Sequence, residues 1–128
     1  MKIMLVDDDP VFNFIARKLI ESAKIDFSLE EYLDGSEALE ALKKKESPDQ
    51  LPDHILLDIN MPKVNGWQFL EALRNMNIEK DITVTIVTSS IDGEDRRKAF
   101  TYPEIDEFLI KPISKTDLSE ILLKNRSV

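Results

Sequence analysis

The chain has 128 residues, 42% apolar and 33% charged, which suits one soluble globular domain without a membrane span. It has no cysteine, which excludes disulfides, thiolate chemistry and sulfur-ligated metals and makes a cytoplasmic protein the default expectation. The formal net charge of -8 argues against direct nucleic-acid binding, and the lysine run at 43–45 is better explained as a solvated helix end.

Short apolar runs alternate with amphipathic segments along the chain, which predicts five strand–helix units. The predicted strands are the runs 3–6, 27–33, 54–57, 82–87 and 105–110. Asp9 and Pro10 form a start signal for the first helix, with Asp as the cap and Pro in the first turn. The residues expected on the buried face of this helix are Val11, Phe14, Ile15 and Leu19.

The later helices are predicted from the same spacing of apolar residues. Their expected core-facing residues are Ala38, Leu39, Ala41 and Leu42 in the second, Phe69, Leu70, Leu73 and Met76 in the third, and Leu118, Ile121 and Leu122 in the last. A fourth helix, from about Asp92 to Phe100, is nearly all polar and therefore the most weakly anchored. This order of elements favours an α/β fold in which helices cover both faces of a five-stranded parallel sheet.

Charged residues follow three of the predicted strands. Asp7, Asp8 and Asp9 follow the first strand, Asp58 follows the third, and Lys111 follows the fifth. The carboxyl ends of parallel strands open onto one crevice, so these groups are expected to gather there as a site for a metal and a phosphoryl group. Neighbouring aspartates repel one another unless a cation is present, which favours metal binding for Asp7 and Asp8 and leaves helix capping to Asp9.

Four motifs give the chain a wider resemblance. They are Leu5 to Pro10, Leu57 to Pro62 with Asn65-Gly66 following, Val87 to Ser89, and Leu109 to Pro112. Together they resemble the receiver domain of two-component response regulators, the CheY-like superfamily, over essentially the whole chain. The resemblance implies a doubly wound, flavodoxin-like (βα)5 fold with strand order 2-1-3-4-5. Residues 1–128 would form a single receiver domain with no output domain, either a stand-alone receiver or one domain excised from a longer protein.

The resemblance implies a phosphoacceptor rather than an enzyme. Asp58 would take a phosphoryl group from the phosphohistidine of a histidine kinase or a histidine phosphotransfer protein. Mg²⁺ would be the cofactor, with side-chain ligands from Asp8 and Asp58, the carbonyl of Asn60, and Asp7 acting directly or through water.

The same resemblance assigns the switch. Thr88 would donate its hydroxyl to the phosphoryl group, Lys111 would approach it from a cis bond to Pro112, and Phe108 would follow Thr88 inward. The helix at about 92–100, the fifth strand and the last helix would form the face for a downstream protein target. The chain would be a monomer or a phosphorylation-dependent dimer.

One departure from the family pattern lies between these motifs. The stretch from Phe100 to Glu104 replaces a glycine-containing connection and puts Lys111 one residue further from Thr88 than is usual. Ser89 therefore stays an alternative to Thr88.

Other interpretations are weaker. His54, the only histidine, begins a strand at the end opposite the acids and is expected to be structural. The rival from another class is a Mg²⁺ phosphohydrolase of the haloacid dehalogenase kind, with Asp7 as nucleophile and Asp9 as general acid. Such enzymes need a further acidic pair after the lysine, whereas only Asp117 and Glu120 follow, both in a helix pattern. A receiver-like module that works without phosphate would not need the complete set of acids.

Overall fold

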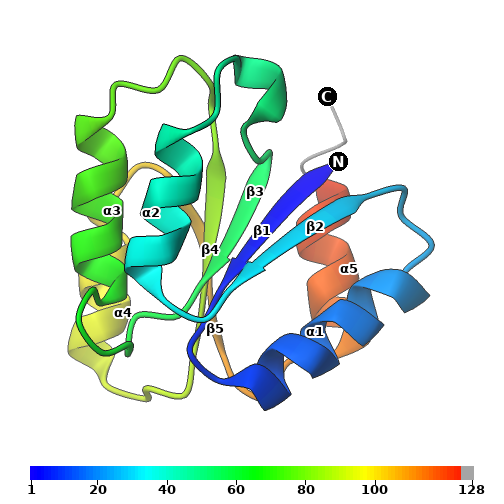
Figure 1. Ribbon diagram of the computed structural model, residues 1–128. Helices are drawn as coiled ribbons and strands as arrows, with labels where there is room; N and C mark the ends of the chain where they lie inside the picture. The colour runs from blue at the N-terminus through cyan, green and yellow to red at the C-terminus, as the bar shows by residue number, and fades with distance from the viewer. Residues whose placement is uncertain (125–128) are drawn as a thin grey trace.

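The computed structural model describes residues 1–124, in which two layers of helices enclose a five-stranded sheet (Figure 1). The strands are β1 (Lys2–Val6), β2 (Ser28–Tyr32), β3 (His54–Leu57), β4 (Thr83–Thr88) and β5 (Ile105–Ile110). Their order in space is β2-β1-β3-β4-β5, and each neighbouring pair is parallel. The predicted α/β class and the flavodoxin-like strand order are confirmed.

The helices divide between the two faces of the sheet. They are α1 (Pro10–Ser22), α2 (Gly35–Lys43), α3 (Gly66–Asn75), α4 (Gly93–Ala99) and α5 (Lys115–Lys124), with a short 3-10 helix η1 (Pro48–Gln50) between α2 and β3. In Figure 1, α2, α3 and α4 cover one face, and α1 and α5 cover the other. Right-handed crossovers on either side of β1 produce this division. None of the helices in residues 1–124 is both long and apolar enough to cross a membrane.

Each face of the sheet has its own core because successive strand residues point to opposite sides. In β1, Met4 and Val6 join the core under α2, α3 and α4, while Ile3 and Leu5 join the core under α1 and α5. Burial on both faces explains why the central strands are continuous apolar runs. The carboxyl ends of the strands are thereby held rigidly at one edge of the molecule.

The predicted buried face of α1 is wrong. Val11, Phe14 and Ile15 are 66%, 52% and 47% exposed, and only Leu19 of the predicted set packs partly against the core. The residues that α1 buries are Phe12, Asn13, Ala16 and Ile20. Two stripes of apolar residues run along this helix, and the tight turn after β1 selects the stripe with fewer large side chains.

The extra residue before Lys111 is absorbed by β5. The pairing of β4 with β5 shifts by one residue, from Val84 opposite Ile105 to Thr85 opposite Glu107. Asp106 is therefore the residue left out of the register, as in a β-bulge. After the shift Thr88 lies opposite Ile110, so the strand ends are again level and Lys111 begins next to Thr88.

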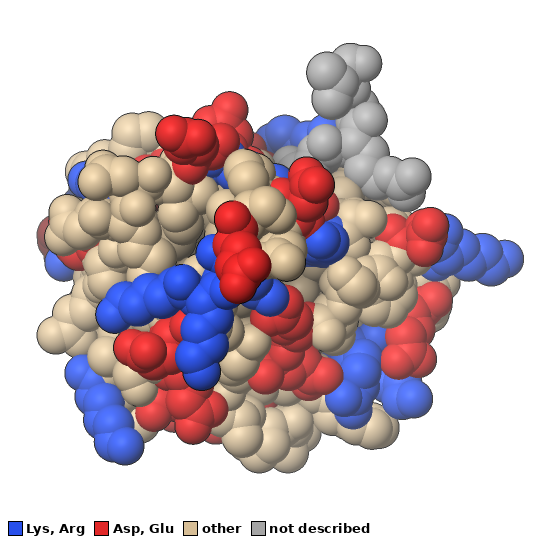
Figure 2. Space-filling view, turned by 45° about the horizontal axis from the view of Figure 1, so that its top comes forward, with Lys and Arg blue, Asp and Glu red and all other residues tan. Residues whose placement is uncertain are grey.

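The surface in Figure 2 has basic and acidic side chains interspersed. On that face the described residues therefore form no continuous basic surface of the kind that binds a phosphate backbone.

Candidate functional site

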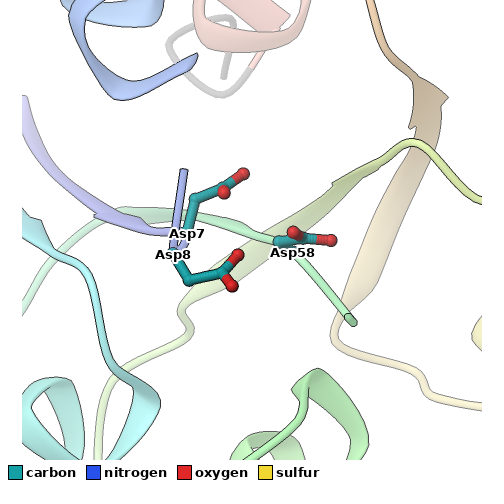
Figure 3. Close-up of side chains that lie close together, drawn as sticks. All are labelled: Asp7, Asp8 and Asp58. Atoms are coloured by element: carbon teal, nitrogen blue, oxygen red, sulfur yellow. The ribbon is translucent and has the colours of Figure 1, made fainter. Parts of the chain in front are cut away.

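Three aspartates meet at the carboxyl ends of β1 and β3. Asp7, Asp8 and Asp58 each offer a carboxylate oxygen, and these oxygens all lie within 4.8 Å of one another. Figure 3 shows the three side chains extending into the same region. Asp7 and Asp58 are buried, whereas Asp8 is exposed. This grouping was expected from the sequence, and the structure accounts for it because β1 and β3 are neighbours in the sheet.

The turn after β1 fixes the direction of the Asp7 side chain. The amide of Asp9 donates to Asp7 Oδ1 at 2.9 Å, and Asp9 Oδ1 accepts from the amide of Val11 at 3.0 Å. The main-chain amide of Asp7 donates to the carbonyl of Tyr32 at 3.1 Å, which ties the turn to β2. Asp9 is thus an N-cap, as predicted, and its carboxylate serves α1.

The turn after β3 holds Asp58 in a similar way. The amide of Asn60 donates to Asp58 Oδ1 at 3.1 Å, and the amide of Asp58 donates to the carbonyl of Val6 at 3.0 Å. Gly66, the first residue of α3, packs so closely on this turn that a Cβ there would lie 2.6 Å from Ile59 Cα. A side chain at position 66 would displace the turn, so this glycine is required by a close approach.

Lys111 brings one positive charge to the carboxylates. Its Nζ lies 2.8 Å from Asp7 Oδ2 and 3.7 Å from Asp58 Oδ2, and 4.3 Å from the centre of the Phe12 ring. The Lys111 amide donates to the carbonyl of Thr88 at 2.8 Å, and the bond to Pro112 is cis, as the family resemblance implied. The lysine therefore continues the edge of the sheet and points back into the site.

Burial dominates the electrostatics of the two buried acids. It raises the pKa of Asp7 from 3.8 to about 6, although Lys111 and the Asp9 amide act to lower it. Burial also raises the pKa of Asp58, and the Asn60 amide, Lys111 and the Thr88 side chain partly offset this effect. The Lys111 ammonium thus lies beside two buried carboxylates, Asp7 and Asp58, and the exposed Asp8 carboxylate lies next to them. This arrangement has the chemistry of a site for a hard divalent cation, so the residues present fit Mg²⁺.

The hydroxyl of Thr88 lies inside the site, whereas Ser89 is exposed. Thr88 is fully buried, and its Oγ1 accepts from Asn60 Nδ2 at 3.3 Å and from the Ser90 amide at 3.2 Å. Phe108 is buried on the face of the sheet under α2, α3 and α4, and the Arg96 guanidinium lies 5.9 Å from its ring centre. The geometry brings together the residues expected in the site, with Phe108 in the neighbouring core.

His54 lies at the other end of β3. It is fully buried, and its Nε2 is 2.8 Å from Thr85 Oγ1 on β4. Burial lowers the pKa of His54 to about 4, so the neutral imidazole is the form present near pH 7. The expectation of a structural histidine agrees with these contacts.

Sequence reasoning missed Asn13. Its side-chain Nδ2 donates to the main-chain carbonyl of Asp7 at 3.0 Å, and the residue is only 3% exposed. The available signal was a polar residue on a helix face that packs against the sheet. That signal was hidden, because the predicted buried face of α1 did not include position 13.

The chain is similar to known proteins along almost its whole length. A model of the response regulator receiver domain matches residues 3–123. The chain belongs to this family. The sensor histidine kinase CheAY of Helicobacter pylori is 32% identical over 96% of this chain, which spans 15% of that protein. The probable methanogenesis regulatory protein FilR2 of Methanothrix harundinacea is 31% identical over 91% of this chain, which spans 75% of that relative.

Solved receiver structures share the whole fold. A crystal structure of a two-component response regulator from Cytophaga hutchinsonii superposes with a TM-score of 0.87 at 25% identity, covering 99% of this chain and 97% of that one. The protein is therefore a receiver domain of two-component signalling, and the receiver family is a family of signalling domains. The haloacid dehalogenase alternative is not favoured, and in addition its general acid, Asp9, is engaged as the cap of α1.

Proposed function

We propose that this receiver domain is the phosphoacceptor of a phosphorelay and that Asp58 is the acceptor residue. Lys111 next to Asp58, at the rigid carboxyl edge of the sheet, is the observation that carries the proposal. A carboxylate oxygen of Asp58 attacks the phosphorus of a phosphohistidine. The new bond is the O–P bond of an acyl phosphate, and the broken P–N bond leaves its electron pair on the imidazole of the donor.

Metal binding belongs to this proposal. Asp8 and Asp58 would hold Mg²⁺ together with the carbonyl of Asn60, and Asp7 would act directly or through water. A bound Mg²⁺ would neutralise charge that develops on the oxygens of the transferring phosphoryl group. Lys111 and the hydroxyl of Thr88 supply fixed positive charge and a hydrogen-bond donor to the same group.

The proposed partners are a histidine kinase or a histidine phosphotransfer protein upstream and a protein target downstream. The output face would comprise α4, β5 and α5. In α4 only Ala99 is buried, so moving this helix disrupts little packing. Arg96 of α4 lies over Phe108 of β5, with 5.9 Å from its guanidinium carbon to the ring centre. A shift of Thr88 and Phe108 towards the phosphoryl group would therefore reach the surface of α4.

Labelling with acetyl phosphate and Mg²⁺ tests the proposal. Wild type should acquire a base-labile phosphate, as expected of an acyl phosphate, and Asp58→Asn should not. Asp7→Asn is the matched variant, since it removes a neighbouring carboxylate and leaves the acceptor in place. Label that persists in Asp58→Asn and disappears in Asp7→Asn would refute the assignment of Asp58. Turnover of p-nitrophenyl phosphate by the wild type would favour a hydrolase.

A further inference from the structure

Asn13 is a polar residue in the first turn of α1, on the face of the helix that packs against the sheet. It is the only polar member of the set of buried residues of α1, and its neighbours there belong to the core under α1 and α5. Asparagine favours caps and turns over helix interiors because its amide competes with the main chain for hydrogen bonds. An apolar residue would suit both the helix and the core better at this position.

The side chain of Asn13 is also incompletely satisfied. Its Nδ2 donates to the carbonyl of Asp7 at 3.0 Å, but its Oδ1 is buried and has no hydrogen-bond partner in the described residues. A buried acceptor without a partner lowers stability. The bond to Asp7 fixes the orientation of the amide, since turning it over would set Oδ1 against the Asp7 carbonyl. The chain therefore has a polar side chain on the buried face of α1, and the hydrogen bond of that side chain goes to a site residue.

We infer that Asn13 is a positioning residue, which holds the main chain of Asp7 and so sets the distance of its carboxylate from Asp58 and Lys111. This inference rests on the proposed function. Two contacts hold the Asp7 main chain from either side, the Tyr32 carbonyl of β2 at its amide and the Asn13 side chain of α1 at its carbonyl. With the second contact removed, the peptide between Asp7 and Asp8 loses the bond that fixes its carbonyl, and the turn through Asp9 that orients the Asp7 carboxylate is held less firmly.

The consequence is specific to cation binding. The carboxylate oxygens of Asp7, Asp8 and Asp58 lie within 4.8 Å of one another, and a cation gains from all of them only while that spacing is kept. Loss of the Asn13 contact should therefore weaken Mg²⁺ binding by about 10-fold, the lower end of the range for residues that support metal ligands. The chemical step should change little once Mg²⁺ is saturating, because Asp58 and Lys111 remain.

Asn13→Leu and its smaller counterpart Asn13→Ala remove the donor, and Thr85→Val is the matched control. Thr85 is also fully buried and also loses a side-chain hydrogen bond, to His54, but it lies towards the other end of the sheet. Mg²⁺ binding to each protein is measured by isothermal titration calorimetry, without a phosphodonor. The dissociation constant should rise about 10-fold for the Asn13 variants and stay within about twofold of wild type for Thr85→Val. An unchanged constant in the Asn13 variants, or an equal rise in all three, overturns the inference.

Two further measurements keep the test decisive. In acetyl phosphate labelling, Asn13→Leu should need more Mg²⁺ for half-maximal rate but reach the wild-type maximum, whereas a lower maximum at unchanged Mg²⁺ dependence contradicts the inference. If neither Asn13 variant folds, NMR of the wild type decides: the side-chain amide signal of Asn13 should move as Mg²⁺ is added, and a static signal overturns the inference. Failure of wild type to label at all would instead refute the proposed function. The calorimetry would still test the role of Asn13 in Mg²⁺ binding, because it needs no phosphodonor.

Discussion

The two ends of the sheet bury polar groups in different ways. At the amino ends of the strands, His54 is neutral near pH 7 because burial lowers its pKa to about 4, and its ring nitrogen contacts Thr85. At the carboxyl ends, Asp7 and Asp58 are buried side by side around one lysine, and burial raises both pKa values. The first arrangement carries no net charge near pH 7. The second carries more negative than positive charge at pH 7, which suits the binding of a further cation, and this difference separates the two polar clusters.

The largest expected effect is on the stability of the metal-free protein. The pKa of Asp7 is raised from 3.8 to about 6, so the folded protein holds this proton more tightly than the unfolded chain. The resulting loss in the free energy of unfolding is absent below pH 3.8, grows as the pH rises to about 6, and is complete above it. Asp7→Asn should therefore stabilise the metal-free protein at pH 8 by up to about 3 kcal/mol, at 1.36 kcal/mol for each pKa unit.

Urea unfolding with a chelator at pH 8 measures this effect. Asp26→Asn removes an exposed carboxylate before β2 and makes the same change in net charge, so it should leave stability nearly unchanged. Saturating Mg²⁺ should reverse the order, because wild type gains the free energy of binding and Asp7→Asn gains less. A destabilised Asp7→Asn in the chelator would mean that the contact with Lys111 outweighs the burial of the carboxylate.

The next largest expected effect is on the rate of labelling when the Lys111 ammonium is removed. Lys111→Met keeps the length of the side chain and removes the charge that lies 2.8 Å from Asp7 and 3.7 Å from Asp58. The initial rate of labelling by acetyl phosphate should fall by about 100-fold, as when one electrostatic contact to a transition state is removed. Lys115→Met, on the exposed first turn of α5, is the control and should label at the wild-type rate. Equal labelling rates for the two variants would show that Lys111 takes no part in the transfer of the phosphoryl group.

The sequence predicts most of this arrangement because the strands are buried on both faces. Continuous apolar runs with charged residues at their ends have few alternative placements, so β3 and β5 are found at the predicted residues. The acids at 7, 8 and 58 then meet because β1 and β3 are neighbours, an order taken from the family resemblance. Helix α4 was found within its predicted range although it is nearly all polar.

What the sequence could not predict depends on three-dimensional contacts of particular residues. Val11, Phe14 and Ile15 form the larger apolar stripe of α1, but the turn capped by Asp9 sets the phase of the helix and leaves them exposed. The one-residue surplus before Lys111 was visible, yet only the pairing of β4 with β5 shows that Asp106 absorbs it.

At the amino end of the sheet, His54 makes the free energy of unfolding depend on pH in the direction opposite to Asp7, and by a smaller amount. The unfolded His54 takes up a proton below pH 6.5, whereas the folded protein does so only near pH 4. Stability from this group is therefore present at pH 7 and is lost as the pH falls. The expected loss between pH 7 and pH 5 is about 2 kcal/mol.

His54→Gln removes the titrating group and keeps a polar side chain beside Thr85. Urea unfolding of both proteins at pH 7 and pH 5 isolates the histidine, since the opposite contribution of Asp7 is common to both and cancels in the difference. Wild type should lose about 2 kcal/mol more than the variant over this range. Equal losses would show that His54 is protonated in the folded protein at pH 5, and the contrast between the two ends of the sheet would fail.

The smallest effect concerns the choice between two neighbouring hydroxyls. Thr88 is fully buried, accepts a hydrogen bond from Asn60 and helps to lower the pKa of Asp58, whereas Ser89 is exposed. Thr88→Val keeps the shape and removes the hydroxyl, which should slow labelling by about 10-fold, equivalent to about 1.4 kcal/mol for one hydrogen bond. Ser89→Ala should label at the wild-type rate. The reverse result would place the serine hydroxyl in the site, and the β-bulge at Asp106 would then not restore the register on which the assignment of Thr88 depends.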